Sequence, residues 1–450
     1  MPAEHPLHVL NPATEEVIAT VPAATAADVD AAVVRAARAQ AKWAALSPAD
    51  RARLLRRFAT AVDEHLEELA QLEVREAGHT VGNARWEAGN VRDLLDYAAG
   101  GVERLTGRQI PVAGGLDVTI LEPLGVVGVI APWNFPMPIA AWGTAPALAA
   151  GNAVLLKPAE TTPLSALFFA DVCRQAELPR GVVNIVTGAG DTGRYLVEHP
   201  DVDKVAFTGS TEVGRQIARS VAGTGKRLTL ELGGKAANIV FDDAPIDQAV
   251  EGIVNGIFFN QGHVCCAGSR LLVQESIAEE LLASLKRRMA TLRVGDPLDK
   301  NTDIGAINSA AQLARITELS EIGTTEGAER WSPPCELPDR GFWFAPTIFT
   351  GVTQAHRIAR EEIFGPVLSV LTFRTPDEAI EKANNTPYGL SAGIWSEKGS
   401  LILAVADRLR AGVIWANTFN KFDPTSPFGG YKESGYGREG GRHGLEAYLA

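Results

Sequence analysis

From residue 125 onward, short apolar runs rich in β-branched residues alternate with stretches of helical periodicity. The first series consists of VVGVI (126–130), AVLL (153–156), VVNIV (182–186), KVAFT (204–208) and RLTLE (227–231). A second series, from about residue 237 to 417, includes IVF, SRLLV, PVLSVLTF, LSAGIW and AGVIWAN. Strands and helices that alternate at this spacing form βαβ units around a parallel, doubly wound sheet. The sequence therefore predicts an α/β fold with two α/β domains and a cleft between them.

Two segments before this alternation have a different character. We interpret the first hundred residues as scaffold helices, because Thr25 with Asp28 forms a capping-box pattern before one amphipathic run. Ser47 and Pro48 supply an N-cap and a first-turn proline before the next run. Residues 108–122 (RQIPVAGGLDVTILE) instead place a Gly-Gly pair between two β-rich arms, which predicts a hairpin outside the main sheet.

Composition excludes several classes of protein. The 450 residues include 42 Lys plus Arg against 54 Asp plus Glu, and a net charge of -12 disfavours nucleic acid as a partner. Four cysteines cannot form the disulfide scaffold of a secreted domain, so we expect a cytoplasmic protein. No zinc-ligand spacing such as CxxC occurs, and we expect no metal.

No membrane or export segment is expected either. Residues 123–156 carry no charge, but the four prolines between positions 132 and 146 would each remove a backbone donor that lipid could not replace. We therefore expect no membrane partner. The N-terminal MPAEHPLHVLNPATEE has acids and prolines where a signal peptide needs a basic start and an apolar run.

Two glycine-rich loops follow predicted strands, which is where open parallel sheets bind ligands. Gly188, Gly190 and Gly193 satisfy GxGxxG, but no acid follows the next strand cleanly and ordinary turn chemistry explains the pattern equally well. The second loop, residues 208–214 (TGSTEVG), opens a helix whose free N–H groups favour a phosphate. A simple Ser/Thr helix cap is the alternative for that loop.

Cys265 is the strongest candidate nucleophile. It lies in NQGHVCCAGSR (260–270), between an apolar helical stretch and a strand, with glycines and polar side chains on both sides. A lone cysteine is usually a small core hydrophobe, but this setting indicates a loop that brings a thiol to an opening.

Two polar residues at strand ends complete a candidate site. Glu231 ends the strand RLTLE and could either activate water or simply pair with Lys235. Asn134, in the PWNFP turn after VVGVI, could be an ordinary turn residue or a donor toward a developing oxyanion.

Seven segments then occur in a fixed order: PWNFP, KPAETTPL, FTGSTEVG, ELGGK, NQGHVCCAGSR, EEIFGPV and SPFGGYKESGYGRE. Over essentially the whole chain this series closely resembles the aldehyde dehydrogenase superfamily, in its hydrolytic, NAD(P)-dependent branch. The resemblance implies a Rossmann-like cofactor domain with a five-stranded parallel sheet (1–103 and 124–232), an oligomerisation hairpin (104–123) and a catalytic domain (233–433). Residues 434–450 would return to the cofactor domain, without the final strand of relatives.

The resemblance assigns roles residue by residue. It implies that Cys265 is the nucleophile, that Glu231 is the general base, and that Asn134 forms the oxyanion hole with the Cys265 N–H. The implied cofactor-binding residues are Trp133, Lys157, Glu160, Gly209, Ser210, Gly214, Glu362 and Phe364. Within that set, Lys157 and Glu160 would meet the adenosine ribose, Ser210 the pyrophosphate and Glu362 the nicotinamide ribose. Because a carboxylate at position 160 accepts a 2′-hydroxyl and repels a 2′-phosphate, NAD is expected rather than NADP.

The implied reaction is oxidation of a small aldehyde to the carboxylic acid through a thiohemiacetal and a thioester on the cysteine. Phe135, Trp142 and Phe428, with the loop 419–422, suggest an apolar tunnel for this substrate, although they could equally be core residues. Two alternatives stay open: a catalytically silent scaffold of the same fold, and a cofactor-independent thiol esterase.

Two substitutions and one missing element depart from the family pattern. His263 stands where relatives usually have Gln, and Gly143 stands where many have Lys, which puts a lysine-assisted proton relay in doubt. Because the hairpin is present and the final strand is missing, we expect a homodimer rather than a stable tetramer.

Overall fold

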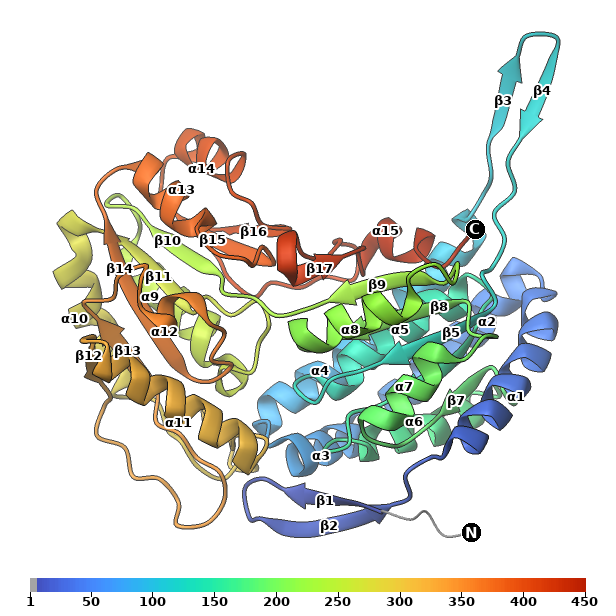
Figure 1. Ribbon diagram of the computed structural model, residues 1–450, viewed down its shortest axis with the longest axis horizontal. Coiled ribbons are helices and arrows are strands. Elements are labelled where there is room, and N and C mark those ends of the chain that lie inside the picture. Colours follow the sequence, from blue (N-terminus) through green and yellow to red (C-terminus); the bar gives the residue numbers. More distant parts are fainter. Residues whose placement is uncertain (1–5) are drawn as a thin grey trace.

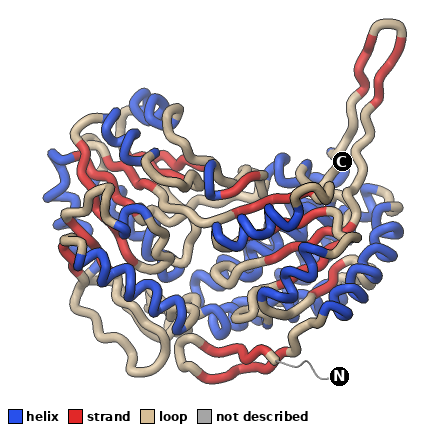
Figure 2. Tube along the Cα trace, in the orientation of Figure 1, coloured by secondary structure: helices blue, strands red, loops and turns tan. Residues whose placement is uncertain are grey.

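The computed structural model describes residues 6–450. Residues 1–5, part of the segment in which we predict no export signal, lie outside the described residues. The described strands form two large sheets and two small hairpins, with helices packed around the sheets (Figures 1 and 2). The prediction of an α/β fold built on two mainly parallel sheets is confirmed.

The first large sheet has six strands in the order β17-β9-β8-β5-β6-β7. Its strands are β5 (Val126–Ile130), β6 (Ala153–Lys157), β7 (Val183–Ile185), β8 (Lys204–Thr208), β9 (Arg227–Glu231) and β17 (Gly435–Tyr436). Five of them run parallel, as predicted, and β17 from the C-terminal segment adds antiparallel to β9. Residues at the carboxyl ends of β5 and β9 therefore reach the same edge of this sheet.

Helices cover both faces of the first sheet, and each face has its own apolar core. The helices are α1 (Ala26–Ala44), α2 (Pro48–Glu64), α3 (Leu66–Ala77), α4 (Val81–Gly101), α5 (Pro136–Ala149), α6 (Leu164–Gln175), α7 (Gly190–Glu198) and α8 (Thr211–Val221). The predicted capping box is present, since Thr25 accepts from the Asp28 N–H and Asp28 accepts from the Thr25 N–H. Ser47 caps α2 in the predicted way, with Pro48 in its first turn.

The second large sheet has seven strands in the order β12-β13-β14-β11-β10-β15-β16. These strands are β10 (Ala237–Val240), β11 (Arg270–Gln274), β12 (Glu329–Trp331), β13 (Thr347–Thr350), β14 (Val367–Phe373), β15 (Ser391–Trp395) and β16 (Val413–Ala416). Its helices are α9 (Ile246–Phe258), α10 (Ala278–Met289), α11 (Ala310–Thr325), α12 (Arg357–Arg360), α13 (Pro376–Asn384) and α14 (Gly399–Ala406). Apart from the antiparallel edge strand β12, the sheet is parallel. Strands β12 and β13 were not predicted from the sequence.

The prediction of helices throughout the first hundred residues is wrong for the start of the chain. Residues 7–21 form an antiparallel hairpin of β1 (Leu7–Asn11) and β2 (Glu16–Val21). Its turn is tight, because Glu15 has a left-handed φ of 60° and its N–H binds the Asn11 carbonyl at 2.7 Å. The local alternation of apolar and polar residues decides the strand state here, and the helical pattern begins only at the capping box.

The predicted second hairpin consists of β3 (Gln109–Val112) and β4 (Gly115–Val118). It projects away from the rest of the molecule, and every residue of both strands is exposed (Figure 1). The chain ends at its base after α15 (Gly441–Glu446), where the Ala450 N–H donates to the Glu122 carbonyl at 2.9 Å. The exact division of the chain into domains stays a prediction.

Within residues 6–450, no helix combines the length and apolarity needed to cross a bilayer. The uncharged stretch 123–156 is divided among β5, the 14-residue α5 and β6, all of them buried. Its apolar character therefore reflects burial in and around the first large sheet.

Packing between α9 and β15 provides a test of the fold. A Cβ at Gly252 would lie 2.0 Å from the Trp395 ring, which is fixed by a 2.8 Å hydrogen bond from its Nε1 to Asn238. Gly252→Ala should therefore lower the free energy of unfolding by about 1–3 kcal/mol in chemical denaturation. Gly89→Ala in α4, where a Cβ has only ordinary contacts, should leave it unchanged or raise it by up to about 1 kcal/mol. Equal effects of the two substitutions would contradict this packing.

Candidate active site

Cys265 follows a strained turn between α9 and β11. Within the turn Phe259–Gly262, Asn260 and Gln261 have left-handed φ values of 49° and 55°, and Gly262 has a φ of 73°. A left-handed conformation costs a residue other than glycine about 1 kcal/mol or more, so two in succession persist only where neighbouring groups hold them.

Side-chain amides from the turn itself provide this support. Asn260 Nδ2 donates to the Asn134 carbonyl at 2.8 Å, and Gln261 Nε2 donates to the carbonyls of Gly78 and Ala306 at 3.2 and 3.1 Å. Both amides are fully buried. Gly262 is required for space as well, because a Cβ there would lie 2.2 Å from the Gly365 oxygen. The turn therefore fixes the position at which the half-buried Cys265 emerges.

Asn134 is hydrogen-bonded to the loop that carries Cys265. It follows β5 and is buried, and its Nδ2 donates to the His263 carbonyl at 2.8 Å. A primary amide carries two N–H donors, so this bond orients the group and leaves the second donor available. Asn134 therefore has the chemistry of an oxyanion donor in a fixed orientation.

Glu231 is buried at the carboxyl end of β9. Across residues 6–450 neither of its carboxylate oxygens finds a hydrogen-bond partner, and Lys235, the alternative ion-pair partner, also has an unpaired Nζ. Burial, followed by the charges of Glu439 and Cys265, raises the pKa of Glu231 well above its usual range. A carboxyl group with a raised pKa beside a thiol is suited to proton transfer.

Cys265 and Glu231 line two different cavities. The first, of about 260 Å³, we call the polar cavity; it is lined by Pro132, Trp133, Asn134, Thr208, Gly209, Ser210, Glu231, Leu232, Gly233, Cys265, Gln312, Arg315, Glu362, Ile363 and Phe364. The second, of about 50 Å³, we call the aromatic cavity; it is lined by Trp86, Asn90, Phe135, Pro138, Ile139, Trp142, Thr208, Glu231, Val264, Cys265, Cys266, Phe422 and Phe428. The thiol, the carboxyl group and Thr208 are common to both. A group bound in either cavity can therefore reach the same sulfur.

Five of the predicted cofactor residues line the polar cavity. Ser210 caps α8 by accepting from the Val213 N–H at 3.3 Å, and its own side chain is exposed at that helix N-terminus. Glu362 accepts from the Gly234 N–H at 2.9 Å, and burial raises its pKa to about 7. Trp133, Gly209 and Phe364 complete this group.

The other three predicted cofactor residues do not line this cavity. Lys157 is the last residue of β6, and its Nζ forms an ion pair with the Glu160 carboxylate at 3.8 Å. Lys157 is buried, whereas Glu160 is exposed. Gly214 lies within α8, where a Cβ would come 2.5 Å from the Leu232 side chain. Gly214 therefore allows α8 to pack closely on the Leu232 side chain.

The burial of the His263 ring determines its charge. Its ring packs edge-on to Trp133 at 4.9 Å between centroids and stacks with Phe364 at 5.9 Å. It is fully buried, and burial, with a smaller contribution from His79, lowers its pKa to about 3. A neutral ring cannot supply positive charge to a nearby thiolate. Its backbone carbonyl, by contrast, orients Asn134.

Gly143, the second departure from the family pattern, faces β5. A Cβ at this position would lie 2.7 Å from the Val129 side chain, so α5 packs directly on the strand there. The charges that shift the pKa of Glu231 come from Glu439 and Cys265, which raise it, and from Arg438, which lowers it.

The predicted substrate residues Phe135, Trp142 and Phe428 all line the aromatic cavity. Phe422, from the predicted loop, also lines it, and its ring centroid lies 5.8 Å from that of Phe428. Trp86 and Asn90 in α4 also line this cavity and were not predicted from the sequence. No sequence pattern pointed to them, because nothing in the sequence of an amphipathic helix shows that it packs beside a loop far later in the chain, at residue 265.

The sequence matches the Aldehyde dehydrogenase family over residues 1–450. It is 45% identical over 447 residues to an aldehyde dehydrogenase of Enchytraeus buchholzi, covering 98% of this chain and 90% of the relative. It is 44% identical over 444 residues to a betaine aldehyde dehydrogenase of Rhizobium etli, covering 98% and 91%. The NAD⁺ complex of an aldehyde dehydrogenase from Bacillus cereus superposes with a TM-score of 0.97 at 41% identity, covering 99% and 92% of the two chains.

The chain belongs to the aldehyde dehydrogenase family. The predicted family and the predicted enzyme class, an aldehyde dehydrogenase, are thereby confirmed. The alternative of a catalytically silent scaffold is not favoured. The roles assigned to individual residues stay predictions that the observed geometry supports.

The two adjacent cysteines should differ in reactivity. Cys266 is fully buried, its thiol donates to Asn420 Oδ1 at 3.7 Å, and burial raises its pKa well above the usual range. Iodoacetamide should therefore modify Cys265, with the half-buried Cys335 as a second site, and leave Cys266 and the buried Cys173 unmodified in the native protein. Peptide mass spectrometry locates the label. Preferential labelling of Cys266 would contradict the assignment of the nucleophile.

Proposed function

We propose that the protein oxidises an aldehyde to the carboxylic acid with NAD, using Cys265 as the nucleophile and Glu231 as the base that activates water. One observation carries this proposal: Cys265 and Glu231 form the shared wall of the polar and aromatic cavities. An aldehyde in the aromatic cavity and a nicotinamide in the polar cavity would both reach the sulfur. A cofactor-independent thiol esterase would need only one of the two spaces.

In the first half of the reaction, the Cys265 thiolate adds to the aldehyde carbon and the carbonyl π bond opens onto oxygen. The free N–H of Asn134 Nδ2 and the backbone N–H of Cys265 would donate to this oxyanion. When bound, NAD supplies the acceptor to which the carbon loses its hydride. The carbonyl then re-forms and leaves a thioester on Cys265.

In the second half, Glu231 takes a proton from a water molecule as the water oxygen attacks the thioester carbon. The carbon–sulfur bond then breaks, which releases the carboxylic acid and restores the thiolate. The absence of a hydrogen-bond partner for Glu231 among the described residues leaves both oxygens free to accept from water.

The residues of the polar cavity fit NAD. Ser210 and the N-terminus of α8 would meet the pyrophosphate, because free N–H groups and the helix dipole favour negative charge. Glu362 carries a carboxyl group suited to the nicotinamide ribose, and Lys157 with Glu160 would hold the adenosine ribose. The NAD complex of the Bacillus cereus relative supports the choice of cofactor.

We further infer a cytoplasmic homodimer. Cys173, Cys265, Cys266 and Cys335 are all free thiols, which suits a reducing compartment. The β3–β4 hairpin exposes Ile110, Val112, Leu116 and Val118, and its outer edges offer unpaired backbone groups to a second copy.

Glu231→Gln tests the reaction scheme. The amide cannot accept the proton of water, so acylation should persist while hydrolysis slows by about 100-fold or more. Stopped-flow mixing with an aldehyde and NAD should show one burst of NADH per active site, followed by slow turnover. In the wild type, hydrolysis should accelerate as pH rises, because the raised pKa of Glu231 shifts the formation of its carboxylate, the form that accepts the proton, to higher pH.

The control for this experiment is Cys265→Ala, which should give neither burst nor turnover. If burst and steady state slowed equally in Glu231→Gln, a role restricted to hydrolysis would be refuted. A loss of the burst in Cys266→Ala alone would refute Cys265 as the nucleophile.

Glu160→Ser tests the preference for NAD. Removal of the carboxylate should raise kcat/KM for NADP relative to NAD by about tenfold or more, because no negative charge would then repel the 2′-phosphate of NADP. A tenfold change corresponds to about 1.4 kcal/mol. Glu177→Ser, an exposed acid elsewhere in the same half of the chain, should leave the ratio unchanged. Comparable kcat/KM for both cofactors in the wild type would contradict the assignment of Glu160.

Light scattering at physiological salt tests the assembly. The wild type should have twice the mass of one chain, and Leu116→Asp should shift it toward the monomer, because a charge on the exposed hairpin opposes apolar association. Asp117→Asn should have no such effect. A tetramer that persists on dilution would refute the homodimer.

A further inference from the structure

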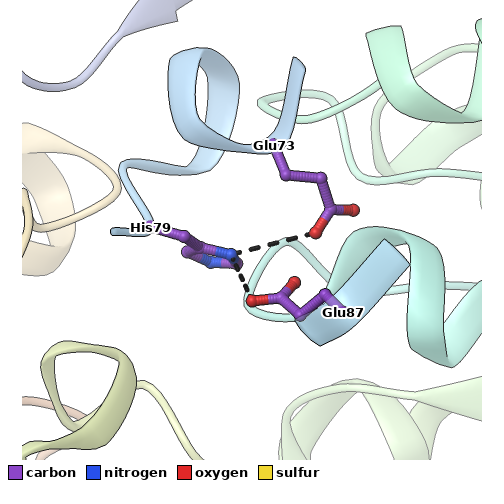
Figure 3. Close-up of side chains that lie close together, drawn as sticks. All are labelled: Glu73, His79 and Glu87. Carbon is purple, nitrogen blue, oxygen red and sulfur yellow. Dashed lines mark ion pairs between the residues drawn. The ribbon is translucent and has the colours of Figure 1, made fainter. Parts of the chain in front are cut away.

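A second group of reactive side chains lies outside both cavities, where α3 meets α4. Glu73 from α3, His79 from the segment between the helices and Glu87 from α4 point toward one another (Figure 3). His79 Nδ1 is 2.8 Å from a Glu87 oxygen and 3.9 Å from a Glu73 oxygen. One ligand atom from each residue lies within 4.8 Å of the other two, and the exposed fractions are 1%, 0% and 0%.

The polar atoms of this cluster are largely without hydrogen bonds. Within the described chain, both ring nitrogens of His79, both oxygens of Glu87 and one oxygen of Glu73 have no hydrogen-bond partner. The second Glu73 oxygen accepts from the Met137 N–H at 2.8 Å. A buried polar atom without a partner costs about 1–3 kcal/mol, and here several of them face the same point.

Glu76, one turn along α3 from Glu73, is buried to the same extent and provides a contrast. Its carboxylate accepts from the Leu164 N–H at 2.6 Å, the Ser165 N–H at 2.9 Å and the Ser165 hydroxyl at 2.5 Å. The fold therefore provides donors for a buried carboxylate where that group is only structural. In the part of the chain described, no such hydrogen bond is made to Glu87, and the nitrogen closest to it is His79 Nδ1 at 2.8 Å.

Two states could satisfy the Glu73–His79–Glu87 cluster. Protons could neutralise the carboxyl groups, and burial does raise the pKa of Glu87 to about 8. A divalent cation would instead neutralise the two carboxylates of Glu73 and Glu87. It would also accept an electron pair from the neutral His79 ring, so that unpaired atoms of all three residues become ligands. Only the cation draws on both the carboxylates and the histidine as electron-pair donors.

We propose that Glu73, His79 and Glu87 form a binding site for a divalent transition metal ion, with Zn²⁺ as the best match to one imidazole and two carboxylates. Such a ligand set with ligand distances of about 2.0–2.2 Å is typical of zinc, and a fourth position would be left for water. The expectation of no metal rested on cysteine spacing, and a His/Glu site lies outside what that spacing can detect.

The site would act as a structural brace. Glu73 also holds the first turn of α5 through Met137, and the His79 ring lies 6.1 Å from that of Phe135. Both contacts are within three residues of Asn134. None of the three ligands lines the polar or aromatic cavity, so the proposal does not depend on the reaction proposed above.

Zinc binding to the full-length Cys265→Ala protein tests the proposal, because that variant removes the reactive thiol as a competing ligand. After chelator treatment and dialysis, isothermal titration with Zn²⁺ should give one site per chain, and zinc should raise the unfolding temperature. Adding His79→Lys places an ammonium group beside the carboxylates. It should weaken zinc binding by at least about 100-fold, since even loss of a residue that only supports a ligand costs up to that factor.

Glu76→Gln in the same background is the matched control and should keep the zinc affinity. The zinc K-edge absorption spectrum gives a second measurement that needs no further variant: it should show nitrogen and oxygen neighbours without sulfur. Absence of a zinc site in the folded Cys265→Ala protein, equal affinity after His79→Lys, or a sulfur neighbour in the spectrum would each overturn the proposal.

Discussion

The left-handed turn at Asn260–Gly262 is the constraint on which the site depends. Its two amide side chains bind backbone carbonyls of three separate segments, at Asn134, Gly78 and Ala306. The loop after β5, the α3–α4 junction and the cysteine loop are consequently held in one arrangement. A thiol on an unsupported loop could not keep a fixed distance from the proposed base at the end of β9 and the proposed oxyanion donor after β5.

Burial then gives chemically similar groups different roles. The thiol of Cys266 is buried and held protonated, whereas Cys265 opens to two cavities. Among the carboxyl groups, Glu76 is saturated by donors, whereas Glu231 has none among the described residues. His263 is neutral because it is buried between aromatic rings. The residue type alone therefore does not predict what each side chain can do. Its burial and the hydrogen-bond donors around it decide this.

Much of this arrangement could be predicted from sequence because its signals are local. The β-branched runs, the caps at Thr25 and Ser47 and the loop after each strand depend on neighbouring residues. The order of seven motifs supplied the long-range information that assigned Cys265, Glu231 and Asn134.

What the sequence did not reveal depends on contacts between distant segments. Trp86 reaches the aromatic cavity because α4 packs beside the loop at Phe259, with ring centroids 5.9 Å apart. The Glu73–His79–Glu87 cluster has no motif spacing, since it forms only when α3 packs on α4. Strand β12 (ERW) begins with two charged residues and lies at the edge of its sheet, so it shows no apolar run.

In the proposed reaction, Cys265 carries the acyl group after the hydride has left. Fragmentation mass spectrometry of Glu231→Gln, quenched shortly after exposure to an aldehyde and NAD, measures this directly. An acyl adduct should appear on Cys265 and should require NAD, because without oxidation the aldehyde forms only a reversible thiohemiacetal. An adduct on Cys266, or acylation of Cys265 that is independent of NAD, would contradict the proposed reaction.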